Sequence, residues 1–171
     1  MSDVFYLRPI SPPATGEQVL AMAASAGGCF ELHRVDWLHS FLARPGDRML
    51  CWYRAPDAES ARLALRDLGS DMSAVWSGQA LAEIEGLDID RINLLTEVVS
   101  EGPFSLESAA GQIERLLPTA ELLGGFLSLD GRRMIGLSYS IDPGSASGDE
   151  DVADAGITVS SWPCEVLTPN L

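Results

Sequence analysis

The residues that could do chemistry are few, and His39 is the best candidate among them, whereas the other histidine, His33, is expected at the surface. A neutral imidazole can act as a general acid or base, or bind a metal ion. Glu97 interrupts an apolar run, and burial of a carboxylate there would raise its pKa toward a useful range. We predict His39, Glu97 and Tyr53 as catalytic residues, and His39 with Glu97 as metal ligands. The alternatives are a hydrogen-bonded core histidine and a solvent-exposed glutamate.

Composition excludes several other chemistries. All 11 basic residues are arginine, so lysine-based Schiff-base and P-loop chemistry are excluded. The 25 acidic residues give a formal charge of −14, which disfavours nucleic acid as a partner. Three widely spaced cysteines (Cys29, Cys51 and Cys164) predict neither a disulfide framework nor a zinc knuckle. With no long apolar run and no signal-peptide pattern, we expect a cytoplasmic protein without a membrane partner.

The elements that must position these residues repeat along the chain. When the sequence is shifted by 85 residues, Phe41-Leu42 falls on Phe126-Leu127 and Gly46 falls on Gly131. Self-similarity at a fixed offset is typical of internal duplication. We therefore predict two ferredoxin-like repeats, residues 1–85 and 86–171, the second degenerate.

Pattern and turn signals predict the elements of each repeat. Thr15, Asp57 and Ser105 are the expected helix N-caps. We expect strands over 4–10, 35–43, 48–55, 74–81, 93–99, 122–129, 132–141 and 158–167, and helices over 15–27, 58–68, 105–117 and, frayed, within 148–155.

The order β-α-β-β-α-β is that of ferredoxin-like folds. Aromatic residues on the second face of each sheet favour packing of one sheet on the other. The sequence therefore predicts an α+β fold in which two βαββαβ repeats pack sheet to sheet as a pseudo-dimeric α+β barrel, as a monomer or a homodimer.

Strand alternation predicts which side chains meet inside this barrel. We expect His39, Cys51 and Tyr53 to point inward, where the second repeat carries Gly124 and Gly136. Strand glycines often mark a close approach of ligand or backbone, although they can also be bulges that serve tight packing. We predict one asymmetric pocket, with these binding residues: Trp37, Cys51, Tyr6, Gly124 and Gly136.

The runs Val35–Leu42 and Arg48–Asp57, followed by Glu59, resemble a family of small nickel-binding, ferredoxin-like domains of otherwise unknown function. That family shows a Trp-x-His-Ser-Tyr strand, a Cys-x-Tyr strand and an Ala-Pro-Asp/Asn-Glu helix start. The resemblance covers about residues 4–81. It implies a domain that pairs through its sheet and binds nickel or another first-row transition metal, with His39 and Cys51 at the family's His and Cys positions.

Two functions stay open on this basis. One is a protein that binds a small ligand or a nickel-like metal ion in a pocket around His39. The other is a cofactor-independent enzyme of the isomerase, cyclase or monooxygenase type, with His39 as general acid or base.

Overall fold

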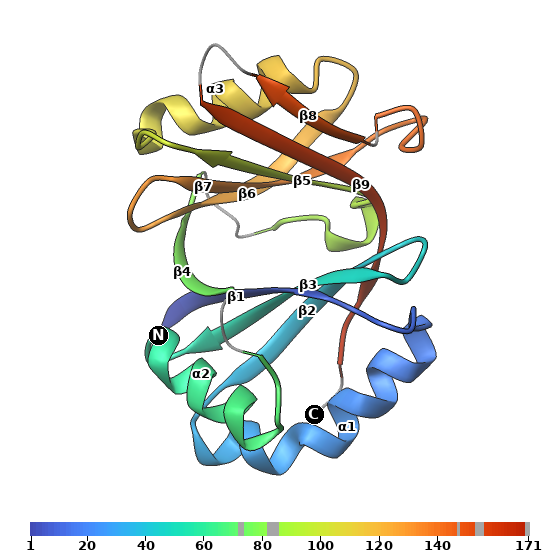
Figure 1. The fold of residues 1–171 in the computed structure, drawn as a ribbon, viewed down its shortest axis with the longest axis vertical. Coiled ribbons are helices and arrows are strands. Elements are labelled where there is room, and N and C mark those ends of the chain that lie inside the picture. The colour runs from blue at the N-terminus through green and yellow to red at the C-terminus, as the bar shows by residue number, and fades with distance from the viewer. Residues whose placement is uncertain (72–73, 82–85, 147, 153–155, 170–171) are drawn as a thin grey trace. The chain divides into compact units, whose positions relative to one another are not determined.

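The computed structural model describes residues 1–71, 74–81, 86–146, 148–152 and 156–169, with only the backbone for 150–152. Figure 1 shows the course of the chain. The elements are β1 (Ser2–Pro9), α1 (Gly16–Leu32), β2 (Asp36–Ala43), β3 (Arg48–Ala55), α2 (Ala58–Asp67), β4 (Val75–Ala80), the 3₁₀ helix η1 (Ile89–Arg91), β5 (Leu94–Ser100), α3 (Leu106–Leu116), β6 (Glu121–Ser128), β7 (Arg133–Tyr139), β8 (Gly148–Val152) and β9 (Ile157–Leu167).

The chain divides into two compact units. The first unit comprises Met1–Gly78 and Glu165–Leu171, and the second comprises Gln79–Cys164. Within the described residues, no helix is both long and apolar enough to cross a bilayer.

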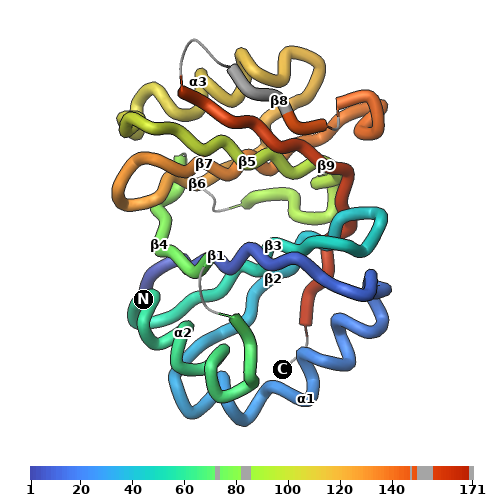
Figure 2. The backbone as a smooth tube through the Cα atoms, in the orientation of Figure 1, coloured from blue at the N-terminus to red at the C-terminus, as the bar shows by residue number. Residues whose placement is uncertain are grey.

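The first unit is an antiparallel sheet with α1 and α2 on one face, which we call its helix face (Figures 1 and 2). The strand order is β2-β3-β1-β4, and the end of β9 pairs with β2. The helix face carries a continuous apolar core. Helix residues such as Ala23, Phe30 and Leu65 pack there against Val4 and Met49 of the sheet.

The predicted helix starts are confirmed. Thr15 and Gln18 form a reciprocal capping box: the Thr15 N–H donates to Gln18 Oε1 (2.9 Å) and the Gln18 N–H donates to Thr15 Oγ1 (3.3 Å). Asp57 Oδ1 accepts a 2.7 Å hydrogen bond from the Ser60 N–H, and Ser105 caps α3 in the same way. These bonds satisfy backbone donors that have no partner inside the helix.

The second unit contains the ladder β6-β7-β5-β9-β8, the α-helix α3 and the 3₁₀ helix η1. Ala109 and Ile113 of α3 pack against Leu94, Val98 and Met134 of the sheet. The end of β4 enters this unit, where the Leu81 N–H donates to the Gly125 carbonyl (2.9 Å).

The two hairpins share their register. In β2–β3 the pairing shifts between Trp37 and His39, and in β6–β7 it shifts between Leu122 and Gly124, 85 residues further along. Both shifts are β-bulges that leave one residue unpaired.

The predicted fold class, two βαββαβ repeats packed sheet to sheet as a pseudo-dimeric barrel, is wrong. The strands form one hydrogen-bonded ladder, β2-β3-β1-β4-β6-β7-β5-β9-β8, with a further β2–β9 pairing, instead of two separate four-stranded sheets. Only three α-helices occur in the described part of the chain, one of them in the second unit.

The helix expected within residues 148–155 is also wrong. Gly148–Val152 is instead strand β8, which pairs antiparallel with Ile157–Ser161. The 11-residue β9 offers backbone partners there, and such pairing overrides a weak local preference for helix. The remainder of the expected helix, residues 153–155, lies outside the described residues.

Candidate ligand-binding cavity

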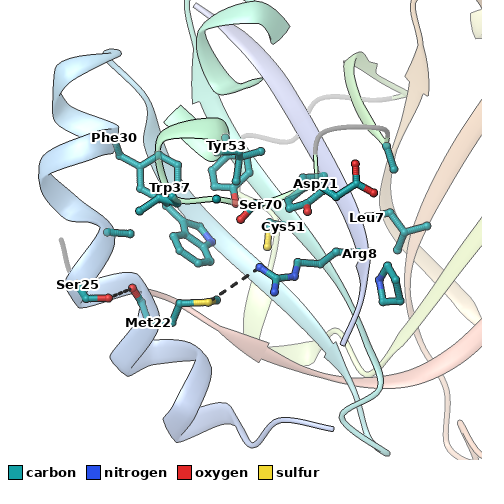
Figure 3. Close-up of a pocket in the computed structure, with 17 residues that line it drawn as sticks. Leu7, Arg8, Met22, Ser25, Phe30, Trp37, Cys51, Tyr53, Ser70 and Asp71 are labelled. Atoms are coloured by element: carbon teal, nitrogen blue, oxygen red, sulfur yellow. Dashed lines mark hydrogen bonds between the residues drawn. The ribbon is translucent and has the colours of Figure 1, made fainter. Parts of the chain in front are cut away.

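A cavity of about 500 Å³ opens on the helix face of the first unit. It lies among β1, β2 and β3, helices α1 and α2, and the segment that follows α2 (Figure 3). Its lining divides into an aromatic group and a polar group. The aromatic residues are Tyr6, Phe30, Trp37 and Tyr53, and the polar ones include Arg8, Ser25, Cys51, Ser70 and Asp71.

Three aromatic rings form one wall of this cavity. The centroids of Phe30 and Trp37 are 5.4 Å apart, those of Phe30 and Tyr53 5.4 Å, and those of Trp37 and Tyr53 5.6 Å. Tilted and edge-on contacts at such spacings are favourable and hold the rings in place. All three side chains are at least 94% buried, so the wall is preformed.

A chain of hydrogen bonds crosses the floor of the cavity. Trp37 Nε1 donates to Ser40 Oγ (2.8 Å), and the Ser40 hydroxyl donates to Cys51 Sγ (3.3 Å). The Tyr53 hydroxyl is hydrogen-bonded to the same sulfur. Cys51 is therefore a fixed acceptor in a buried network.

Burial controls the protonation of these groups. It raises the pKa of the Cys51 thiol, against the opposing effect of the hydrogen bonds from Ser40 and Tyr53. It also raises the pKa of Tyr53 well above 10, and the neighbouring Cys51 adds to this. The pKa of Tyr6 is raised as well, mainly by burial. At neutral pH all three side chains are therefore uncharged.

Arg8 supplies the positive charge at the cavity. Its guanidinium lies 5.9 Å from the centroid of the Tyr6 ring, and its Nη1 lies 4.0 Å from Met22 Sδ (Figure 3). Within the described ranges, no carboxylate lies within ion-pair distance of this guanidinium. The half-buried guanidinium therefore faces the cavity, where it contacts Tyr6 and Met22 and where Asp71 also belongs to the lining.

The structure brings together Tyr6, Trp37, Cys51 and Tyr53, which were predicted as binding or catalytic residues, but on the face opposite to the one expected. Met49, Cys51 and Tyr53 point toward the helices, so the faces assigned to β3 are wrong. The β2 bulge explains the position of Trp37. Leu38 is the extra residue of this bulge, so Trp37 lies on the helix face together with Ser40, and His39 lies on the opposite face.

His39 lies on the other face of this sheet, outside the cavity. Its Nδ1 is 3.0 Å from Thr168 Oγ1, and its ring centroid is 5.4 Å from that of Trp52. These contacts orient the imidazole. The catalytic and metal-binding roles assigned to His39 stay predictions.

The remaining predicted residues belong to the second unit. Glu97 Oε1 lies 3.3 Å from Arg133 Nε, and its side chain is 12% exposed. A Cβ at Gly136 would lie 2.8 Å from Ile113 Cγ2, so this glycine allows α3 to approach β7 closely. Gly124 is buried and follows the β6 bulge, opposite Leu137. The roles assigned to Glu97, Gly124 and Gly136 toward a ligand stay predictions.

The donors that the resemblance offers for nickel do not fit one site, because His39 and Cys51 lie on opposite faces of the sheet. No group of three or more His, Cys, Asp or Glu residues within the described part of the chain could hold a metal ion. Metal binding by His39 and Glu97 stays a prediction.

The sequence interpretation missed Arg8, Met22 and Phe30 as site residues. A usable signal was present at Arg8, a charged residue within the expected strand 4–10. The sequence of α1 did not indicate which of its side chains face the sheet, because Val19–Phe30 contains no charged residue that would mark the solvent-exposed side of the helix.

The sequence matches no protein-family model and none of the curated proteins. Among solved structures, the chain is similar to an anthrone oxidase-like protein, with a TM-score of 0.53 and 10% identity over 99% of this chain and 93% of that one. A second similar structure is a protein provisionally named a chlorite dismutase, with a TM-score of 0.47 and 10% identity over 96% of this chain and 94% of that one. The first of these likenesses establishes a shared α+β fold.

Proposed function

We propose that this protein binds a planar aromatic small molecule that carries an acidic group, in the cavity of the first unit. The observation that carries the proposal is the guanidinium of Arg8, which faces a preformed aromatic wall without a carboxylate partner among the described residues. In a chain with a formal charge of −14, such an arginine is matched to an anion that arrives from outside.

The size and lining of the cavity support a small organic ligand. Its volume of about 500 Å³ lies within the range of ordinary ligand pockets, and its lining combines aromatic rings with polar groups. The rings of Phe30, Trp37 and Tyr53 offer stacking and edge contacts to a flat ligand. The hydroxyl of Tyr6, neutral at physiological pH, can donate to a ligand oxygen.

The name of the first structural neighbour refers to anthrones, which are fused aromatic ketones. At 10% identity that likeness extends to the fold alone, so the proposal rests on the cavity of this chain. The small-ligand function predicted from the sequence is kept, with its centre moved from His39 to Arg8 and the aromatic wall.

Binding of 2-naphthoate tests the proposal, with 2-naphthamide as its neutral isostere. Trp37 lines the cavity, so quenching of tryptophan fluorescence and calorimetry both report occupancy. Replacing Arg8 by Gln should weaken naphthoate binding by about 10- to 100-fold, the usual value of a charge-assisted hydrogen bond. Naphthamide binding should change little.

Arg44→Gln is the matched control, because Arg44 is an exposed arginine of the same unit outside the cavity. His39→Ala should also leave naphthoate binding unchanged, since His39 lies on the other face of the sheet. Equal losses in Arg8→Gln and Arg44→Gln, or a loss confined to His39→Ala, would contradict the proposal.

A further inference from the structure

A second, smaller cavity of about 260 Å³ borders the first. It lies beside the start of α1 and the segment that joins β1 to α1, and Gln18 is its other polar residue besides Arg8. The apolar residues that line it are Ile10, Pro12, Pro13, Ala14, Val19 and Met22.

Arg8 and Met22 line both cavities, so they form the boundary between them. Their contact, 4.0 Å from Nη1 to Sδ, joins two long side chains and involves no backbone. A methionine side chain is unbranched and adapts its shape readily, and Met22 is 36% exposed. The boundary can therefore open by rotation of side chains alone.

The two cavities differ in the chemistry they offer. The first has aromatic rings and hydroxyl groups, whereas the second has aliphatic walls, with two prolines whose rings cannot rotate away. Arg8 stands where the two environments meet. A ligand that fits both would carry its acidic group between a flat aromatic part and an aliphatic part.

We propose that the two cavities form one binding site for an aromatic acid that bears an aliphatic chain. The ring system occupies the first cavity, the acidic group binds Arg8, and the chain passes Met22 into the second cavity. This inference rests on the proposed function, because it assigns the substrate class of the same site.

A series of 2-naphthoates with unbranched alkyl chains of increasing length tests this. In the unmodified protein, affinity should rise about three- to fourfold for each added methylene until the second cavity is filled, the ordinary effect of burying a CH₂ group. Replacing Ala14 by Leu fills the second cavity. It should abolish the dependence on chain length and leave the affinity for unsubstituted naphthoate unchanged.

Ala24→Leu, on the exposed side of α1 and outside both cavities, is the matched control and should keep the full dependence on chain length. Ile10→Phe fills the same space by a different residue and replaces Ala14→Leu if that variant does not fold. A chain-length dependence that persists in the filled variant overturns the inference.

The two proposals fail in different ways. If unsubstituted naphthoate binds through Arg8 but added methylenes bring no gain, the inference about the chain is overturned and the proposed function stands. If neither naphthoate nor its alkyl derivatives bind the unmodified protein, both are overturned.

Discussion

At the scale of single residues, burial sets the protonation states of three side chains that line the candidate site. Burial raises the pKa values of Tyr6, Cys51 and Tyr53, so these side chains stay protonated through neutral pH. The cavity therefore combines the Arg8 guanidinium and the Asp71 carboxyl group with neutral tyrosine hydroxyls. Under the proposed function, an acidic ligand would bind Arg8 without a change of protonation at Tyr6, Cys51 or Tyr53.

The raised pKa of Tyr53 predicts a loss of stability in alkaline solution. Above about pH 10 the tyrosine of the unfolded chain releases its proton, while the buried native side chain keeps it. The native state then binds more protons than the unfolded state, so the free energy of unfolding falls as the pH rises. The contribution is complete below pH 10, and its slope is at most about 1.4 kcal/mol per pH unit.

Urea unfolding of the unmodified protein and of Tyr53→Phe at pH 8 and pH 10.5 measures this effect. The variant should lose less stability between the two pH values, although Tyr6 and Cys51, whose pKa values are also raised, keep part of the slope in both proteins. Parallel losses in the two proteins would show that Tyr53 ionises normally.

At the scale of elements, close approach of a helix to a sheet decides where glycine is required. Gly136 of β7 leaves no room for a Cβ against Ile113 of α3. Gly111, on the same helix, has nothing within 4 Å of the position that a Cβ would take. The two glycines therefore differ in what an added methyl group would meet.

Replacing each of these glycines by Ala tests the packing of the second unit. Gly136→Ala should destabilise the protein by about 1–3 kcal/mol, because overpacking forces side chains or backbone to move. Gly111→Ala should stabilise it by about 0.5–1 kcal/mol, since alanine is the better helix former. Chemical denaturation measures both, and similar effects at the two positions would contradict the close packing of α3 on β7.

At the scale of the whole molecule, the last strand completes the first unit. β9 begins in the second unit and ends in the first, where it pairs with β2 and where Thr168 contacts His39. Leu167 is 9% exposed and belongs to the core of the first unit. Residues at the two ends of the chain therefore fold together, although more than 100 positions separate His39 from Thr168.

Shortening the side chain of Leu167 should destabilise the first unit, although most of this unit comes from the first 78 residues. Leu167→Ala should lower the free energy of unfolding by about 2–4 kcal/mol, as expected for a buried leucine. Leu129→Ala, at a leucine that is 71% exposed, is the control and should change it by less than about 0.5 kcal/mol. Equal effects of the two substitutions would mean that the end of β9 does not contribute to the core.

Local sequence determined the helix caps, the two hairpins and the approximate bounds of most elements, because turn residues, capping side chains and hydrophobic period act over a few neighbours. It also determined the residue types that became the aromatic wall. The sequence showed that Arg8 is a charged residue in a strand, but it did not show that Arg8 lines a cavity.

Only the tertiary structure decided which face of β3 met the helices, that β8 is a strand, and that β9 pairs with β2. Because Leu38 is unpaired, Trp37 and His39 lie on opposite faces of the sheet. The alternation of side chains along a regular strand does not predict where such an unpaired residue occurs. Pairing between strands far apart in the sequence depends on partners that no local pattern contains. The cavity arises from those pairings, which is why its residues were partly foreseen and its location was not.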